Sequence, residues 1–176
     1  LFTDDPKRAD PGIRLLPPSS EHWFGTDRLG RDVWSRTIYG SRISMIVGLG
    51  VAAVVGFFST LTGLIAGYNR TFDSVYMRLM DGIMAIPTIL VGIALVSITG
   101  SSVQNVIIAL SLATVPRGVR VVRAAVMALA EEVYIEAAVS IGAPTWRVLL
   151  KHILPGVVAP FIVLVSIIIA NSILVE

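Results

Sequence analysis

The side chains that could do chemistry are sparse in this chain of 176 residues. It has no cysteine, which excludes thiolate nucleophiles, disulfides and cysteine-based metal sites. Its two histidines, His22 and His152, are far apart and belong to no metal-ligand pattern, so no metal site is predicted. The sequence also holds no zincin motif, no nucleophile elbow and no catalytic dyad. We therefore expect that the chain is not an enzyme and binds no cofactor itself.

One polar segment stands between long apolar runs. It extends from Glu136 to Pro155 and reads EAAVSIGAPTWRVLLKHILP. Gly142 suits the left-handed position that ends a helix, and Pro144 suits the first turn of the next one. We therefore expect a helix ending at Gly142, a turn, and a second helix that begins at Pro144 and stops at Pro155. A charged helical hairpin held at a membrane surface is suited to docking, either onto lipid or onto another subunit.

Two further groups of ionisable residues are candidates for a functional role. Arg78 and Asp81 are spaced to meet on one helical turn, so Asp81 either pairs with Arg78 or lines a wet path through the membrane. Asp27, Arg31 and Asp32 either border an external mouth where a solute is handed over or form helix caps and local ion pairs. In both groups the sequence favours local pairing.

Membrane-spanning helices must position these residues. The chain is 55% hydrophobic and 15% charged, and its mean hydropathy is +0.80. No charged side chain occurs in residues 43–67, 82–116 or 153–175. A helix crosses a bilayer with about 20 apolar residues. The sequence therefore predicts an all-α integral membrane protein, and the net charge of +2 says little about nucleic acid.

The first predicted span covers Ile43 to Gly67. Its five glycines would let another helix approach closely in lipid, so we expect a helix partner there. Residues 68–81 are expected to form a short connection. The second span is then expected to begin near Gly82 and to bend at Pro87.

The uncharged run 82–116 is too long for one ordinary crossing. We expect it to turn in a tight hairpin at residues 99–102, where the sequence reads TGSS, and the alternative is one long tilted helix. The third span would then run from Val103 past Pro116. Residues 153–175 would form the last span, which gives four visible spans.

Three arginines follow the third span. Arg117, Arg120 and Arg123 recur every third residue, which places them on one side of a helix expected to continue through residues 124–138. Arg117 and Arg120 are expected to reach toward the membrane interface along their aliphatic stems.

The N-terminal part differs from the rest in composition. Residues 1–30 are polar and rich in turn-forming Pro and Gly, and residues 31–44 are expected to form a helix at the headgroup level or a basic flank of the first span. The predicted domains are an external polar segment with its interfacial helix, 1–42, and a transmembrane domain, 43–176. The second domain includes a cytoplasmic loop at 117–155.

The orientation follows from the Lys and Arg content of the short loops. The loops after the first and third spans carry basic residues, and the hairpin loop between the second and third spans has none, so the two basic loops are expected in the cytoplasm. Residues 1–42 hold seven basic and six acidic side chains and would lie outside, against the rule. Long translocated segments follow the rule weakly. The basic residues of the two cytoplasmic loops are Arg70, Arg78, Arg117, Arg120, Arg123, Arg147 and Lys151.

The polar segment resembles a known motif. Glu136-Ala137-Ala138, Gly142 and Leu154-Pro155 match the EAA-loop pattern of permease subunits of binding-protein-dependent ABC importers. The form KHILP at 151–155 is similar to that of the dipeptide, oligopeptide and nickel branch. The stretches FGTDRLGRD at 24–32 and MRLMD at 77–81, the latter followed by Pro87, point to the same branch.

The resemblance implies a permease that imports peptides, or nickel and related solutes, across a bacterial or archaeal cytoplasmic membrane. Such permeases have six spans, so one span before Leu1 and one after Glu176 are expected in the whole protein. The implied partners are a second permease subunit, two ATPase subunits and an external solute-binding protein. ATP and Mg²⁺ would be bound by the ATPase subunits, since this chain has no phosphate-binding loop. An ATP-independent carrier or channel is the alternative.

The resemblance also assigns the polar segment a role. A helical hairpin that is stiff at both ends can pass a rigid-body movement from an ATPase subunit into the spans. Glu136 and Arg147 would make polar contacts with the ATPase, while Ala137 and Ala138 would allow close packing.

Overall fold

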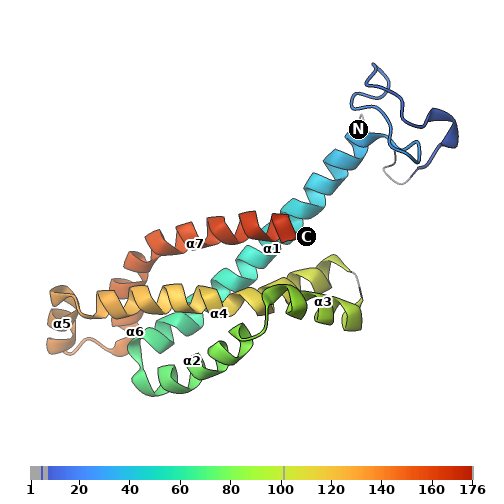
Figure 1. Cartoon of the computed structure of the whole chain (residues 1–176). Helices are drawn as coiled ribbons and strands as arrows, with labels where there is room; N and C mark the ends of the chain where they lie inside the picture. Colours follow the sequence, from blue (N-terminus) through green and yellow to red (C-terminus); the bar gives the residue numbers. More distant parts are fainter. Residues whose placement is uncertain (1–4, 6–7, 101, 176) are drawn as a thin grey trace. The chain divides into compact units, whose positions relative to one another are not determined.

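The computed structural model describes residue 5 and residues 8–100 and 102–175. Within them the regular structure is helical, and one isolated bridge joins Thr26 to Asp32. The chain separates into two compact units, residues 1–46 (unit 1) and 47–176 (unit 2), which are described one at a time. The elements, shown in Figure 1, are η1 (Pro11–Ile13), α1 (Val33–Tyr68), α2 (Arg70–Met84), α3 (Thr88–Thr99), α4 (Val103–Ala130), α5 (Val133–Ser140), α6 (Thr145–Arg147), the π-helical turn η2 (Val148–Ile153) and α7 (Leu154–Val175).

The all-α membrane fold predicted from the sequence is confirmed. Three helical stretches are long and apolar enough to cross a membrane, namely α1, α4 and residues 145–174. The helices α2 and α3 meet at an angle of 82° and would provide a fourth crossing if they act as one broken span. The break falls beside Pro87, which caps the start of α3, so the expected bend at this proline is present.

Unit 1 is a loop folded onto itself, followed by the first turns of α1. The φ angles of Gly25 and Gly30 are +70° and +72°. A Cβ on Gly30 would lie 1.7 Å from the carbonyl oxygen of Asp10, so only glycine fits this crossing of the loop. Trp34 at the start of α1 packs on the ring of Trp23, with ring centroids 5.2 Å apart.

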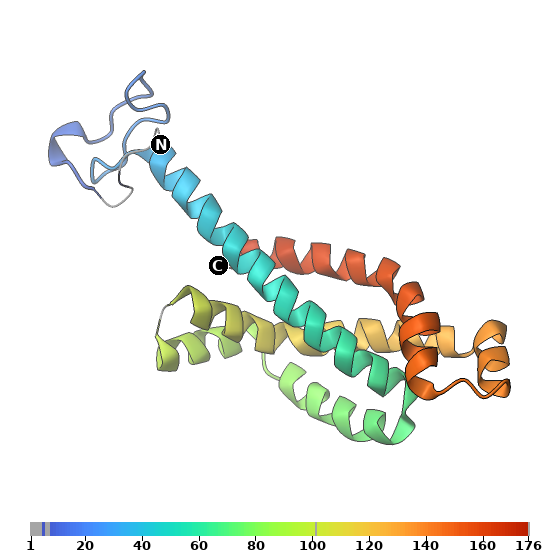
Figure 2. The same cartoon turned by 180° about the vertical axis from the view of Figure 1, so that it is seen from behind.

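In unit 2, α4 is the central helix. It contacts α2, α3 and α7, as the two opposite views in Figures 1 and 2 show. One buried apolar cluster joins α1, α4 and α7 and contains Val47, Val51, Ala52, Val55, Leu110, Leu164 and Ile168. A second cluster lies under α5 and η2 and contains Leu64, Val122, Val126, Ile135, Val148, Ile153 and Val157.

The helix partner expected for the glycines of the first span is present. A Cβ on Gly63 would lie 2.7 Å from Val122, and one on Gly67 would lie 2.6 Å from Val126. On the opposite helix, a Cβ on Gly118 would lie 2.2 Å from Ser59 Oγ. Glycines on both helices therefore let α1 and α4 approach closely.

Residues 68–81 are not the short connection expected from the sequence. They form most of α2, because Asn69 caps the helix by accepting hydrogen bonds from the backbone N–H groups of Thr71 and Phe72, both at 3.0 Å. One face of α2 is apolar and the other polar, which suits a helix at the surface of a bundle.

The hairpin between the second and third spans is confirmed, and the alternative of one long tilted helix is wrong. α3 ends at Thr99 and α4 begins at Val103, with Gly100 at a φ of +90°. Asn105 ties the turn together by donating from Nδ2 to the carbonyl oxygens of Thr99 at 2.6 Å and Gly100 at 2.9 Å. Ser101, part of the predicted turn, lies outside the described residues.

Two predicted helix limits are wrong. The helix after Arg123 does not continue through 138 but breaks at 131–132, where the extended backbone of Glu132 lets α5 turn its buried Ile135 onto the second cluster. The second helix of the polar segment does not stop at Pro155. The helix runs from α6 through η2 into α7. Pro155 has no backbone N–H to donate, and the wider π-turn before it, in which the Leu154 N–H donates to the Leu149 carbonyl, lets the helix continue past this residue.

Candidate docking hairpin

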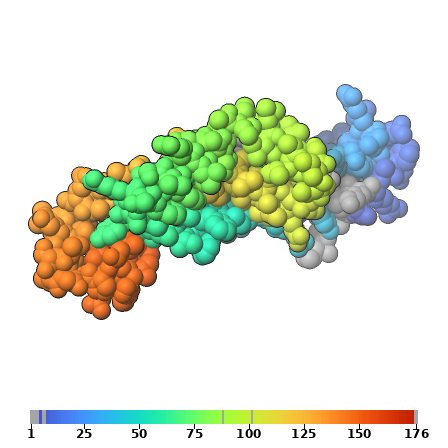
Figure 3. Space-filling view, turned by 90° about the horizontal axis from the view of Figure 1, so that it is seen from below, coloured from blue at the N-terminus to red at the C-terminus, as the bar shows by residue number. Residues whose placement is uncertain are grey.

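Residues 131–155, called the hairpin below, form one end of unit 2. α5 and α6 lie at the end of α4 that is farther from the α3–α4 turn, in both views of the ribbon (Figures 1 and 2). In the space-filling view the orange residues of this region form an exposed end of the unit (Figure 3). The hairpin holds all seven residues that the sequence assigns to the docking segment.

The turn of the hairpin is fixed by its backbone. Gly142 has a φ of +80°, and its N–H donates to the Val139 carbonyl at 2.9 Å, while the Ala143 N–H donates to the Ala138 carbonyl at 3.1 Å. These two bonds form a Schellman motif, which satisfies carbonyls left free at the end of α5. No atom lies within 4 Å of the place where a Cβ on Gly142 would stand, so the conformation alone requires glycine.

The inner side of the hairpin is anchored in the core. Ile135 and Ala138 of α5 are buried, and so are Val148 and Ile153 of η2, while Leu154 packs against the same cluster. The hairpin is therefore a packed body that must move together with α4 and α7.

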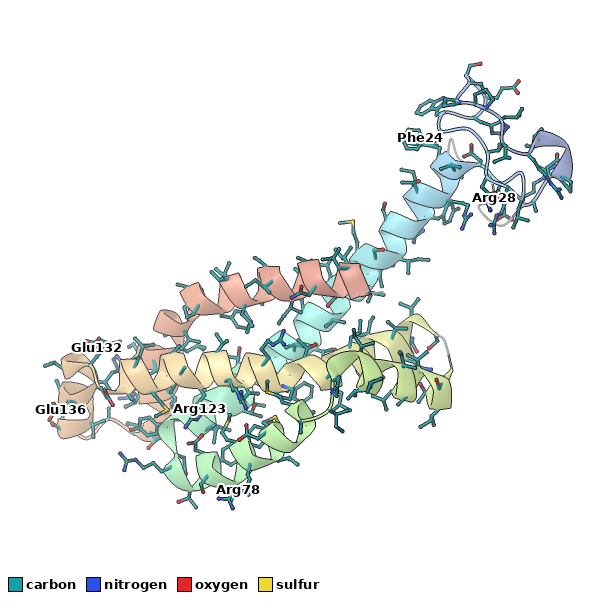
Figure 4. The ribbon with its side chains drawn as sticks, viewed as in Figure 1. Phe24, Arg28, Arg78, Arg123, Glu132 and Glu136 are labelled. Atoms are coloured by element: carbon teal, nitrogen blue, oxygen red, sulfur yellow. The ribbon has the colours of Figure 1, made fainter. Side chains whose placement is uncertain are left out.

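The outer side carries unpaired charges. Glu136, Ala137 and Arg147 are exposed, and Figure 4 shows Glu136 at the outer edge of α5. Neither Glu136 nor Arg147 forms an ion pair within the part of the chain that the structure describes. The guanidinium of Arg147 lies over the ring of Trp146, 5.5 Å from its centroid. Pro155 is also exposed, at the opposite end of η2.

Large apolar side chains, whose exposure the sequence does not predict, accompany these charges. Ile141 is 86% exposed, Val133 78% and Trp146 60%. Exposed apolar side chains beside unpaired charges are typical of a surface that binds another protein. In the sequence these residues appear only as large apolar residues between the charges of the hairpin. Their spacing does not show which of them are buried in the core and which are exposed on the outer side.

Asp81 does not pair with Arg78, contrary to the reading that the sequence favours. Its carboxylate accepts a hydrogen bond from Arg120 at 2.5 Å, and Asp73 pairs in the same way with Arg123, whose Nη2 lies 2.6 Å from Asp73 Oδ2. The two acids lie about two turns apart on the face of α2 that meets α4, whereas Arg78 points away from the bundle (Figure 4). Two ion pairs therefore join α2 to α4.

The three residues considered for an external mouth form local pairs in unit 1. Asp27 accepts hydrogen bonds from the N–H groups of Leu29 at 2.8 Å and Arg31 at 3.0 Å, and its Oδ2 pairs with Arg31 Nε at 2.9 Å and Arg36 Nη1 at 2.6 Å. The backbone N–H of Arg31, followed by the other donors, lowers the pKa of the Asp27 carboxyl despite partial desolvation.

Asp32 caps the start of α1. Its Oδ2 accepts the Ser35 N–H at 2.7 Å, and its Oδ1 lies 3.1 Å from His22 Nδ1. Burial acts to raise the pKa of Asp32, but the hydrogen bonds from Ser35 and His22 outweigh it, so that the pKa is lowered. Asp32 is therefore a structural cap in unit 1.

Among residues 5, 8–100 and 102–175, no three His, Asp or Glu side chains lie close enough together to hold a metal ion.

The sequence of residues 59–175 matches the profile of a protein family described as the binding-protein-dependent transport system inner membrane component. A probable peptide ABC transporter permease of Sinorhizobium fredii is 47% identical over all of this chain and 60% of its own length. A dipeptide transport system permease of Alkalihalophilus pseudofirmus is 45% identical over 88% of this chain and 51% of its own length. A glutathione transport system permease of Pectobacterium atrosepticum is 42% identical over 89% of this chain. The chain spans three fifths or less of the length of these relatives.

Proposed function

Because the chain belongs to the family of inner membrane components of binding-protein-dependent transport systems and is a multi-pass membrane protein, we propose that it is the permease subunit of an ABC importer. The solutes are peptides or chemically related compounds, nickel complexes included. The membrane is the cytoplasmic membrane of a bacterium or archaeon, in keeping with the bacterial origin of the relatives. The permease itself catalyses no reaction.

Its partners are a second permease subunit, two ATPase subunits and an external solute-binding protein. ATP and Mg²⁺ are bound by the ATPase subunits, since this chain has no Gly-rich phosphate loop. The basic residues of the hairpin and Arg70 and Arg78 of α2 favour the cytoplasmic side for the docking surface.

The proposal rests mainly on the hairpin, which has one exposed side and one side packed into the core. Its outer side offers Glu136, Arg147 and exposed apolar side chains to a partner, while its inner side is packed into the core through Ile135, Val148 and Ile153. A displacement of the outer side is passed into α4 and α7, because a close-packed body moves as a unit. Ala138 and Gly142 keep the hairpin compact, and Leu154 and Pro155 lead from it into α7.

The first prediction concerns Glu136→Lys in the full-length protein, expressed with its sister permease, ATPase subunits and binding protein. Reversal of a charge in the docking surface should lower the amount of copurifying ATPase, or the ATP-driven uptake of peptide, by about tenfold. The level of permease in the membrane should not change. Glu21→Lys is the matched control, since Glu21 is an exposed acid of unit 1 outside the hairpin.

Two results would contradict the proposal. One is a variant with normal ATPase binding and normal ATP-driven uptake. The other is a wild-type permease that transports solute without any ATPase subunit, which would make it an ATP-independent carrier or channel.

A further inference from the structure

A cavity of about 270 Å³ lies between α3, α4 and α7, within unit 2 and apart from the hairpin. Most of its wall is apolar. Four polar side chains line it, namely Thr114 and Arg117 of α4 and Asn171 and Ser172 of α7. The described residues that line it are Ile89, Leu110, Thr114, Arg117, Leu164, Ile167, Ile168, Asn171 and Ser172.

Arg117 differs from the two other arginines of α4. Arg120 and Arg123 pair with acids of α2. Arg117 has no hydrogen-bond or ion-pair partner within the part of the chain that the structure describes. Its guanidinium therefore keeps all five N–H donors free for another group.

Arg117 is the first charged residue of α4, directly after the uncharged run 82–116. It lies near the middle of α4, about 20 Å from either end at 1.5 Å per residue. A charged side chain on a spanning helix is costly unless it is paired, reaches the interface or faces a wet cavity, and residues of the last kind commonly mark a solute path. That Arg117 reaches toward the membrane interface stays a prediction, and its exposed side chain also lies in the cavity wall.

The other polar groups of the cavity supply further donors. Thr114 is occupied, because its Oγ1 donates to the Leu110 carbonyl at 2.7 Å. The side chains of Asn171 and Ser172 make no hydrogen bond with any other described residue. No acidic residue is among the described residues that line the cavity. The cavity wall therefore carries one positive charge from α4 together with free side-chain donors from α7, which favours an anion.

We propose that this cavity is a subsite for the carboxylate of a small peptide during its passage through the permease. The planar fork of Arg117 matches a carboxylate with two parallel hydrogen bonds, and Asn171 and Ser172 can each add one. The apolar wall formed by Leu164, Ile167 and neighbouring residues receives aliphatic side chains of the peptide. The inference rests on the proposed transport function and names the chemistry that the pathway recognises.

A thiol reporter tests the charge selectivity without transport. The given sequence has no cysteine, so Ile167→Cys, in the cavity wall, can be labelled in the assembled transporter in lipid nanodiscs. An anionic methanethiosulfonate should react faster than a cationic one, and Arg117→Gln should lower this ratio about tenfold. Ile162→Cys is the matched control, because Ile162 is an equally exposed α7 residue outside the cavity, and its ratio should not respond to Arg117→Gln.

Ligand protection then identifies the anion. Dialanine should slow the labelling of Ile167→Cys, whereas its C-terminal amide and inorganic phosphate should not. Protection by the amide as strong as that by dialanine would overturn the carboxylate assignment. Equal protection by phosphate would reveal a general anion site and would overturn it as well.

Uptake of dialanine by the full transporter is the second test of the subsite. Arg117→Gln should lower dialanine uptake about tenfold, the loss expected for one charge-assisted pair, while ATPase activity stimulated by the binding protein persists. Arg42→Gln, which removes an exposed arginine of α1, should leave uptake unchanged. Normal peptide uptake by Arg117→Gln, together with an unchanged labelling ratio, would refute the subsite alone. A wild-type transporter without ATP-driven peptide uptake would instead refute the proposed function.

Discussion

Asp27 shows how a single carboxylate can hold a loop. Its oxygens accept hydrogen bonds from two backbone N–H groups and two arginine side chains within unit 1. These donors favour the ionised form, and the backbone N–H of Arg31 contributes most to lowering the pKa. The sequence places Asp27 beside Arg31, but only the fold brings Arg36 to the same oxygen.

The pH dependence of unit 1 follows from this lowered pKa. A carboxyl with a depressed pKa in the folded state stabilises that state above its ordinary pKa of about 4, and the contribution is lost as the pH falls toward the folded value. We expect the packing of Trp23 on Trp34 to persist at pH 5 to 7 and to loosen below about pH 4. Tryptophan fluorescence of the full protein measures this change. Asp27→Asn should weaken the acid transition and leave the part that comes from Asp32, whose pKa is also lowered. An unchanged acid transition in that variant would exclude Asp27 as a source.

At the scale of elements, α2 is held to α4 by two ion pairs in different surroundings. The side chains of Asp73 and Arg123 are 20% and 28% exposed, whereas those of Asp81 and Arg120 are 58% and 47% exposed. Water screens the second pair more strongly. The two pairs join the same two helices, so each is a control for the other.

Double-mutant cycles should separate the two pairs. Asp73→Asn with Arg123→Gln should give a coupling energy of about 1 to 2 kcal/mol, and Asp81→Asn with Arg120→Gln about 0.5 kcal/mol or less. The measurement is the free energy of unfolding in detergent micelles, at low and high salt. Equal coupling in both cycles would show that side-chain exposure does not set the strength of these pairs.

At the scale of the whole molecule, the spans decide which loops share a side of the membrane. If α2 and α3 act together as one crossing, the α1–α2 turn and the hairpin face the same side, and the α3–α4 turn faces the other. Asn69 and Thr145 already line one common pocket, in agreement with the first part of this arrangement.

Single cysteines test the arrangement of the spans. Asn69→Cys and Glu136→Cys should react with a membrane-impermeant thiol reagent only from the cytoplasmic side, and Ser102→Cys only from the outside. Residues 1–176 contain no other cysteine, so within them each label reports one position. Labelling of Ser102→Cys from the cytoplasmic side would mean that α2 and α3 do not cross the membrane as one span.

The sequence by itself determined the features that depend on near neighbours in the chain. Uncharged runs predict spans because the bilayer excludes charge, and Gly142 predicts the end of α5 because its left-handed backbone disfavours other residues. The glycines of α1 predicted a close helix partner, although not that the partner is α4.

Only the tertiary structure decided which residues meet across the helices. Asp81 had Arg78 within reach along the chain, yet the packing of α2 against α4 gives it Arg120. The break before α5 likewise depends on where Ile135 finds its buried site. The sequence groups Arg117 with Arg120 and Arg123 on one side of α4, and only the packing of α3 and α7 places Arg117 in a cavity wall. These contacts depend on how the helices pack against one another, and the spacing of residues along one helix does not predict that packing.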